Sequence, residues 1–572
     1  MKKVFLCLSL MGMVTLSSSL ITSLSAQGKF EEVMSKGVLS GNIQIDAQIY
    51  QKDSAIGAEN VPEKIRSNSF AYLQYTNGKF SVGARFEAYQ KAMLGYDARY
   101  DGLGVPYYYA RFSGDIIDIT AGSFYEQFGS GILLRAYQDW NLGLDNSLTG
   151  VRAIVTPVKG VTIKGLIGTQ RYFWKHEGMV RGVDAELAFN DFIKPMKEWG
   201  TRITIGGSFV SKYQEDDNLF IAVINPVDQM VQSYKLNLPL NVGSFAARMN
   251  IESGGFTFGG EYAWKGNDPS AENNFIYKHG QFLLLNVGYS MKGFGILLSA
   301  KSIDNMGYRD NRIETGNYGM INYMPALTRQ HTYSLASFYP YASQPNGEVG
   351  FQADILYKIK KGTALGGKYG TDIKVNASVA TSLKKNPIND QTAIGEGGTL
   401  GYQANLFAVG DEIYFVDANI EISHKFGKHF KASLMYMYEI YNQQIVEGHA
   451  GPNIHANIVV GDFTYMFLKK HALRLEVQYM NTKQRDGDWI MGTLEYTFAP
   501  KWFLSVSDMW NFGNADKSNR LHYYYASASY VHNATRIALS YGRIRQGIMC
   551  AGGVCRELPA SNGLMLTLSS TF

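Results

Sequence analysis

The chain has 572 residues, enough for several ordinary soluble domains or for one very large all-β unit. Apolar residues make up 45% and exclude global disorder, while charged residues reach only 18%, below the roughly 25% of typical soluble domains. The mean hydropathy of −0.15 excludes a polytopic helical membrane protein. An aromatic content of 13%, with 60 glycines and only 14 prolines, favours long strands over a helical bundle.

Residues 1–26 have the layout of a secretory signal peptide. Lys2 and Lys3 precede an apolar run, and a Ser-rich stretch then ends at Ala26, near which we expect cleavage. An N-terminal membrane anchor is the alternative, disfavoured because the apolar run is shorter than the roughly 20 residues that span a bilayer. Loss of the two lysines lowers the formal net charge from +5 to +3, and no basic cluster accompanies it. Nucleic acid is therefore not an expected partner.

Beyond the leader, apolar and polar side chains alternate with period 2, which is the pattern of β-strands. In 41–50 four apolar residues share one face and polar residues share the other, and 79–89, 473–479 and 494–498 repeat this division. The runs are about 9–11 residues long, the length that a tilted strand needs to cross a bilayer. Strands of soluble proteins average about 5–6 residues, so the pattern favours a membrane β-barrel over a soluble sandwich or solenoid. A propeller would need a fixed repeat, and the sequence has none at constant spacing.

Connections of two kinds separate these runs. Short ones, rich in the Gly, Asn and Pro of tight turns, are 77–78, 113–115, 157–160, 253–255, 292–293, 427–428 and 499–501. Long polar ones alternate with them: 52–66, 90–105, 125–149, 212–240, 303–330, 382–410 and 443–453. Short turns at one end and long loops at the other are typical of outer-membrane barrels, whose turns face the periplasm. About eleven short turns predict roughly 24 antiparallel strands, within 20–26, in a single transmembrane barrel over 41–572.

Two segments test the membrane assignment. Residues 282–300 resemble a transmembrane helix, but Lys292 and three glycines argue against it, and two strands joined by a turn explain the same residues. Residues 564–572 alternate and end on the aromatic Phe572, like the assembly signal of bacterial outer-membrane barrels. We therefore expect outer-membrane lipid and the barrel-assembly machinery as partners, in the outer membrane of a Gram-negative cell. Only a short lead-in, 27–40, precedes the first strand, so no N-terminal plug of a TonB-dependent receptor is evident.

A closed barrel turns apolar side chains toward lipid and allows polar ones inside. The predicted lumen-facing polar residues carry both signs of charge: Asp46, Arg85, Glu87, Asp354, Glu421, Arg474, Glu476 and Glu495. Such a mixed wall predicts no strong preference for anions or cations. A bore of roughly 24 strands is wide, so we expect inward-folded loops, or a periplasmic or surface partner protein, to block it.

One segment, 122–152, breaks the alternation and holds four charged residues among glycines and aromatics. These candidate constriction residues are Glu126, Arg135, Asp139 and Asp145. Two interpretations stay open: a loop folded into the lumen as a constriction or ligand site, or an ordered outer loop with its own ion pairs.

Three further stretches have local interpretations. Residues 338–354, rich in Pro and aromatics, are interpreted as a surface lid. Cys550 and Cys555 enclose two glycines that let the chain turn back, and a close pair in an exported protein predicts a disulfide. A redox-active pair is the alternative, without a visible environment that lowers a thiol pKa. Residues 362–369 imitate a phosphate-binding loop, but Tyr369 replaces the required Ser or Thr and a strand pattern follows.

No pattern predicts a cofactor, a metal or a catalytic centre. His424 and His429 flank a tight turn, and His449 and His455 lie near a loop, without the cluster of Cys, His or carboxylate ligands that a zinc site needs. Scattered Ser, His and Asp residues leave an outer-membrane hydrolase as a lesser alternative.

Several stretches together resemble an uncharacterised family of Bacteroidota-type outer-membrane β-barrel proteins, a domain of unknown function. They are FYEQFGSGILLR, LGLDNSLTGVR, YPYASQPNGEVGFQADILY, LGGKYGT and GIMCAGGVCRELP. The resemblance covers nearly all of the mature chain and implies the barrel and its location, but it brings no substrate or catalytic residue. The function favoured is a non-enzymatic channel, transport or secretion-associated barrel for solutes or an exported polypeptide. A surface-binding scaffold or adhesin is the alternative.

Overall fold

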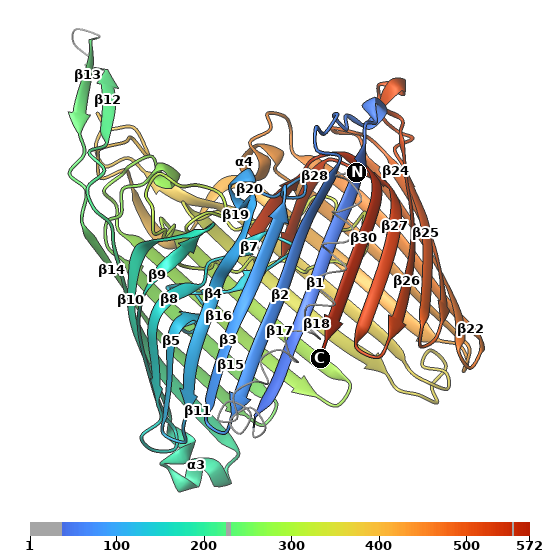
Figure 1. Ribbon diagram of the computed structural model, residues 1–572, viewed down its shortest axis with the longest axis horizontal. Helices are drawn as coiled ribbons and strands as arrows, with labels where there is room; N and C mark the ends of the chain where they lie inside the picture. The colour runs from blue at the N-terminus through green and yellow to red at the C-terminus, as the bar shows by residue number, and fades with distance from the viewer. Residues whose placement is uncertain (1–36, 225–229, 552–553) are drawn as a thin grey trace, which may run out of the picture.

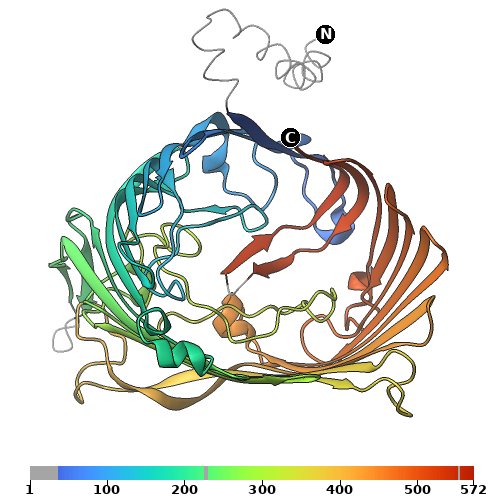
Figure 2. The same ribbon diagram turned by 90° about the horizontal axis from the view of Figure 1, so that it is seen from below.

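The computed structural model describes residues 37–224, 230–551 and 554–572; the predicted signal peptide at 1–26 lies outside the described residues. Twenty-four strands form one antiparallel sheet in which each strand pairs with the next along the chain. β1 (Val38–Gln51) pairs with the last strand, β30 (Ser561–Thr571), so the sheet closes into a barrel (Figures 1 and 2). The predicted single antiparallel barrel of roughly 24 strands is confirmed.

The other barrel strands follow in chain order: β2 (Ile65–Asn77), β3 (Phe80–Gln90), β4 (Gly102–Ser113), β5 (Ile117–Phe124), β8 (Leu148–Val155), β9 (Val161–Tyr172), β10 (Lys175–Ala188), β11 (Thr201–Tyr213), β14 (Asn241–Ser253), β15 (Phe256–Lys265), β16 (Gly280–Met291), β17 (Phe294–Asp304), β18 (Glu348–Ile359), β19 (Thr371–Asn386), β20 (Gln403–Lys425), β21 (Phe430–Tyr441), β22 (Ile454–Leu468), β23 (His471–Thr482), β24 (Trp489–Phe498), β25 (Trp502–Trp510), β26 (His522–His532) and β27 (Thr535–Ile544).

The remaining elements lie in connections. Three are small hairpins: β6 (Gln138–Asp139) with β7 (Leu144–Asp145), β12 (Phe220–Ile224) with β13 (Val231–Lys235), and β28 (Gly547–Ala551) with β29 (Val554–Leu558). The helical turns are η1 (Ser54–Ile56), η2 (Ala98–Tyr100), η3 (Phe189–Asp191), α3 (Lys194–Glu198), η4 (Ala271–Asn273), α4 (Gln443–Glu447) and η5 (Lys517–Asn519). Among the described residues, no helix is long and apolar enough to cross a membrane.

The two ends of the barrel differ as expected for short turns and long loops. Most connections at the lower end of Figure 1 are tight, and the exceptions are 189–200, which carries α3, and 360–370. Most connections at the upper end are long. The predicted loop 303–330 is larger, running over 305–347, whereas the predicted loop 382–410 is smaller, because β19 and β20 extend and leave only 387–402.

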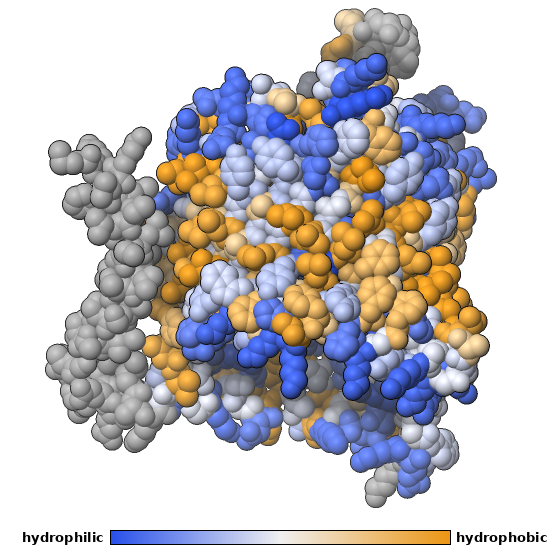
Figure 3. All heavy atoms as spheres, turned by 90° about the vertical axis from the view of Figure 1, so that its right-hand side faces the viewer, coloured by the Kyte–Doolittle hydropathy of each residue, from blue (hydrophilic) through white to orange (hydrophobic). Residues whose placement is uncertain are grey.

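The alternation in sequence becomes a division between outside and inside. On β3, Val82 and Phe86 are 50% and 49% exposed, while Arg85 and Glu87 are 4% and 2% exposed. A soluble protein would bury the apolar pair, so this sheet turns its apolar face outward and its polar face into the bore. Apolar residues form a belt around the middle of the face in Figure 3, with hydrophilic residues above and below it.

Closure removes the free edges of the sheet. Gly41 N–H donates to the Phe572 carbonyl at 2.9 Å, and Thr567 Oγ1 donates to Asp46 Oδ1 at 2.8 Å across the same seam. Backbone groups that face hydrocarbon have no water to bond, so pairing of the first strand with the last satisfies them. Phe572 lies at the lower rim and is 54% exposed.

Candidate functional site

The bore contains segments that connect the barrel's own strands. Three upper connections turn inward (Figure 2): loop 125–147 after β5, loop 305–347 after β17, and the β28–β29 hairpin between β27 and β30. The segment 122–152, for which two interpretations were open, lies folded into the lumen and also carries ion pairs of its own. These three connections define the candidate site, because anything that passes the barrel must pass them.

Loop 125–147 is fixed to the wall by an apolar cluster. Phe128, Ile132, Leu133 and Leu134 are at most 1% exposed. They pack against inward side chains of β9 to β17, namely Leu166, Val180, Val210, Val242, Ala246, Ala263, Phe282, Leu284 and Ile303. Gly182 on β10 leaves space for the loop, because a Cβ at this position would lie 2.7 Å from the Phe128 ring. This part of the bore is therefore a packed core and not an aqueous space.

The four charged residues predicted in this segment do not converge on one site. Glu126 pairs with Lys164 at 2.8 Å and with Arg152 at 3.3 Å, which ties the start of the loop to β9 and β8. Asp139 Oδ1 accepts the Asn141 backbone N–H at 2.9 Å and shapes only its own turn.

Arg135 joins two of the inward segments. Its guanidinium lies 4.4 Å from the ring centroid of Tyr137 and 4.0 Å from that of Tyr323, in loop 305–347. Its backbone N–H also donates to the Ile321 carbonyl at 2.9 Å. Cation–π contact and the backbone bond thus hold the two loops together.

Asp145 belongs to a buried cluster of four charges. Arg171 pairs with Asp145 at 2.6 Å and with Glu87 at 2.7 Å, and Arg85 pairs with Glu87 at 2.7 Å and also with Asp145. The four side chains are at most 5% exposed. Burial alone would raise the pKa of Asp145, but the Arg171 and Arg85 guanidiniums outweigh it and hold that pKa below its ordinary value. The cluster is formally neutral, because two cations face two carboxylates. It fixes loop 125–147 to β3 and β9.

Loop 305–347 covers the opposite side of the wall. Leu335, Tyr339 and Tyr341 are 0%, 2% and 4% exposed and pack with inward side chains of β19 to β24, among them Met437 and Trp489. The interpretation of 338–354 as a surface lid is therefore wrong. Its first half is buried inside the barrel, and from residue 348 onward it is β18.

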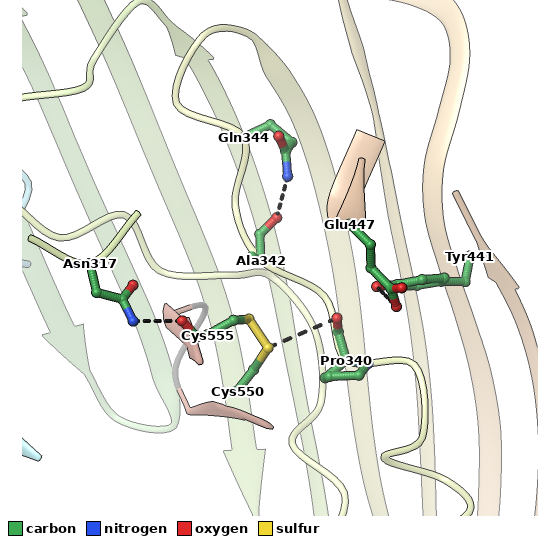
Figure 4. The surroundings of a disulfide bond; sticks show 8 residues. All are labelled: Asn317, Pro340, Ala342, Gln344, Tyr441, Glu447, Cys550 and Cys555. Atoms are coloured by element: carbon green, nitrogen blue, oxygen red, sulfur yellow. Dashed lines mark hydrogen bonds between the residues drawn. A yellow bond between two sulfur atoms is a disulfide. The ribbon is translucent and has the colours of Figure 1, made fainter. Parts of the chain in front are cut away.

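The β28–β29 hairpin carries the predicted disulfide. Cys550 and Cys555 are bonded to each other (Figure 4), while Gly552 and Gly553 between them lie outside the described residues. The Asn317 side chain donates to the Cys555 carbonyl at 2.5 Å, and Cys550 Sγ lies 4.0 Å from the Pro340 carbonyl. The hairpin thus rests on loop 305–347.

The remaining predicted lumen residues lie in separate polar contacts. Asp46 Oδ2 accepts a bond from Gln44 at 2.7 Å, and Asp354 accepts one from Asn376 at 2.7 Å. Glu421 pairs with Arg329 of loop 305–347 at 2.7 Å.

Arg474, in the lower half of β23, is surrounded by three carboxylates. It pairs with Asp462 at 3.0 Å and with Glu495 at 2.9 Å, and it also contacts Glu476. Three carboxylates surround one guanidinium, so this patch is formally negative.

Several buried charges escaped the sequence analysis. Lys301 pairs with Glu348 at 2.8 Å, and both side chains are 0% exposed. Lys301 could have been predicted to face the lumen, because it falls on the inward face of an alternating strand. The sequence pattern does not identify Glu348 or Arg171, because each lies at the upper end of its strand, where the alternation ends and the loop begins.

The described residues enclose cavities between these segments, among them an outer pocket and an inner cavity. The outer pocket, of about 60 Å³, lies where the inward loops meet and is lined by Tyr96, Tyr100, Asp97, Asp145, Arg171, Phe173, Tyr318 and Arg556, with neighbouring loop residues. The inner cavity, of about 310 Å³, lies beneath Gly129 and Ser130 and is lined by Glu186, Arg248, Asn250, Glu261 and Asn286. Over the ranges that the structure describes, no three His, Cys, Asp or Glu side chains are grouped to hold a metal ion.

Similarity to solved structures is limited to the general barrel form. The siderophore receptor PirA from Pseudomonas aeruginosa is 10% identical, with a TM-score of 0.38, over 93% of this chain and 80% of that one. The P pilus usher PapC translocation pore is 8% identical, with a TM-score of 0.39, over 93% and 99%. OccAB4 from Acinetobacter baumannii is 10% identical, with a TM-score of 0.33, over 83% and 98%. Likenesses this low do not extend to what those proteins bind.

No curated protein matches the chain. The model of a family described as "Family of unknown function (DUF6029)" matches residues 1–572, so the resemblance to a family of unknown function is confirmed and the chain belongs to that family.

Proposed function

We propose that this chain is a non-enzymatic transport barrel of the Gram-negative outer membrane, closed by its outer loops and opened by movement of the β28–β29 hairpin. Solutes or an exported polypeptide would pass through the bore of the open barrel. Export by a signal peptide cut near Ala26, recognition of Phe572 by the barrel-assembly machinery, a Bacteroidota-type origin, and a periplasmic or surface partner that moves the hairpin belong to the same proposal.

Unequal anchoring of the inward segments carries this proposal. Loops 125–147 and 305–347 contribute many fully buried apolar side chains to the two large clusters on the wall. Among the described residues of 545–560, only Val554 and Ala560 are buried apolar side chains. Full burial of a large apolar side chain contributes about 1.5–3 kcal/mol, so the hairpin is held far more weakly than the loops. It is the segment that can move while the rest stays packed.

The wall from which the hairpin starts is suited to a passage. Beside larger side chains such as Met509 and Tyr523, several inward positions on β25 to β27 and β30 carry small polar ones: Ser505, Ser507, Ser527, Ser529, Ser540 and Thr567. Ser505 and Ser527 hydroxyls lie 2.8 Å apart, so strands are linked by the same groups that line the wall. Short hydroxyl side chains leave space and accept water, and a displaced hairpin would expose a polar path along them.

The test is planar-bilayer recording of purified protein with residues 547–558 replaced by a short Gly-Ser linker. We expect the deletion to conduct steadily and the intact chain to conduct rarely or weakly. A matched control removes 220–235, the β12–β13 hairpin, which rises above the barrel and does not enter the bore (Figure 1). A folded 547–558 deletion that stays silent would dismiss the gate and, with it, transport by this route.

One observation favours the alternative of a surface-binding scaffold. The β12–β13 hairpin exposes apolar side chains far above the barrel, with Phe220, Val231 and Tyr234 60%, 67% and 52% exposed. If binding to host or cell surfaces is lost on removal of 220–235 while conductance of the 547–558 deletion is absent, the scaffold function is the better account.

A further inference from the structure

We infer that the outer pocket binds an anionic head group, a carboxylate or a phosphate, through Arg556 of the β28–β29 hairpin. The binding site stands on the contacts below, and only its effect on opening rests on the proposed transport function.

The pocket lies where five segments meet. It is lined from the loop after β3 by Tyr96, from loop 125–147 by Gly143, from the end of β9 and the turn after it by Phe173, from loop 305–347 by Tyr318, and from β29 by Arg556. Its volume of about 60 Å³ admits a few water molecules or one anionic group, and it is smaller than the several hundred Å³ of sites that enclose a whole solute. It therefore fits a head group whose remainder stays outside.

Among the described charged residues that line this pocket, Arg556 is the one without a carboxylate partner, and its side-chain hydrogen bond is with Tyr96. Its Nε and Nη1 are buried without a hydrogen-bond acceptor, and over the described ranges no carboxylate lies within 4.0 Å of it. Its guanidinium lies 4.2 Å from the ring centroid of Tyr96. Two buried N–H donors that give up water without an acceptor are costly, and an anion is the acceptor that stabilises them most.

The other charges that line the pocket are already bonded. Arg171 and Asp145 pair with each other at 2.6 Å inside the four-charge cluster. Asp97 pairs with Arg99 at 2.8 Å, and its pKa is lowered to about 2, chiefly by that hydrogen bond. None of them compensates Arg556, so its charge is available to a ligand.

The aromatic walls strengthen such a contact. Tyr100 stacks with Tyr89 at 5.0 Å between centroids and meets Phe173 at 4.6 Å, and these contacts build an aromatic wall of the same pocket. Hydrogen bonds to a charged group gain strength where water is excluded. The pocket is complete only while β29 is docked, so an anion in it favours the docked hairpin and lowers the frequency of opening.

The test titrates the detergent-solubilised full chain with sodium acetate and with sodium phosphate, each replacing sodium chloride at constant ionic strength, and follows tryptophan fluorescence. Trp174 reports on the pocket, because its Nε1 donates to the Tyr100 carbonyl at 2.9 Å. We expect saturable binding that weakens by about tenfold or more in Arg556→Gln and is partly restored in Arg556→Lys. Arg202→Gln, at the exposed lower end of β11, is the matched control and should bind like the unaltered chain.

Saturation by acetate alone identifies a carboxylate site, by phosphate alone a phosphate site, and by both a site for either head group. A chain that responds to neither anion, or Arg556→Gln with unchanged half-saturation, would overturn the inference. Because this readout needs no current, it separates failure of the pocket from failure of the gate. In bilayers, the bound anion should lower the opening frequency of the intact chain and leave that of Arg556→Gln unchanged.

Discussion

The guanidinium of Arg545 lies 3.7 Å from the ring centroid of Phe338, so the chain just before β28 is stacked on the loop that fills the bore. The same guanidinium lies 6.0 Å from the ring of Trp489 on the wall. Hairpin, loop and wall therefore meet at one cation–π contact, which lies where a moving hairpin must pivot.

Replacing Arg545 with Gln should loosen the hairpin. A cation–π contact contributes about 0.5–2 kcal/mol, so the displaced state should become roughly 2- to 30-fold more populated. Opening frequency in planar bilayers measures this. Arg520→Gln is the control, since Arg520 bonds the Asn514 carbonyl on a neighbouring outer loop. An equal rise in both variants, or none in Arg545→Gln, would contradict the pivot.

Replacing Arg171 with Gln should destabilise the barrel strongly. The change leaves Glu87 and Asp145 buried with one cation between them, and breaking a buried pair in this way costs about 3–5 kcal/mol. Urea unfolding in detergent measures this loss in the free energy of unfolding from the midpoint and slope of the transition. Adding Asp145→Asn should recover part of the loss. Lys79→Gln breaks the exposed pair with Asp115 and should leave the midpoint unchanged.

Replacing Phe128 with Ala should release loop 125–147 from the wall. Phe128 is 1% exposed, and removing a buried phenylalanine costs about 3–5 kcal/mol because a cavity is left behind. Hydrogen exchange should rise within 125–147 and stay unchanged in β23. Leu365→Ala, on a lower turn where Leu365 is 75% exposed, serves as the comparison. Exchange that rises equally everywhere would mean general unfolding instead of loop release.

Asp310 should make the stability of the chain depend on pH. Burial raises its pKa from 3.8 to about 7, although Lys212 and a backbone hydrogen bond from Asn311 act in the opposite direction. Between about pH 4 and pH 7 the unfolded chain ionises at this residue while the folded chain stays protonated, so stability falls as the pH rises through this range.

Asp310→Asn mimics the protonated side chain and should remove that loss. The melting temperature of the variant should exceed that of the unaltered chain by more at pH 8 than at pH 5. Asp516→Asn, on an exposed turn, should show no such change with pH. A difference for Asp310→Asn that does not vary with pH would rule out this titration.

The barrel could be predicted because lipid imposes a strict pattern on each strand. Val82 and Phe86 face outward and Arg85 and Glu87 inward, as period 2 requires. The number of strands followed from the short turns, which carry local turn residues. The ends of β19 and β20 were predicted wrongly: the expected loop 382–410 is shorter, because the strands continue to Asn386 and begin again at Gln403.

The filling of the bore could not be assigned, because the same aromatic residues suit a surface lid or a packed core. A signal for it does exist on the wall. Phe282 and Leu284 lie on the inward face of β16, which elsewhere in the barrel is polar, and both pack against the inward loops. Apolar residues on both faces of a barrel strand thus indicate that an inward loop covers the inner surface of the wall at that strand. Pairs such as Arg85 with Asp145 join distant segments and leave no local trace.

The seam between β1 and β30 joins the first barrel strand to the last. Ile45 pairs with Leu568, so the ring cannot close until the last strand is in place. Loops 125–147 and 305–347 belong to strands that come earlier, whereas the β28–β29 hairpin immediately precedes the closing strand. The hairpin that enters the bore is therefore joined directly to the strand that completes the ring, so the same stretch of chain both seals the sheet and fills the space that it encloses.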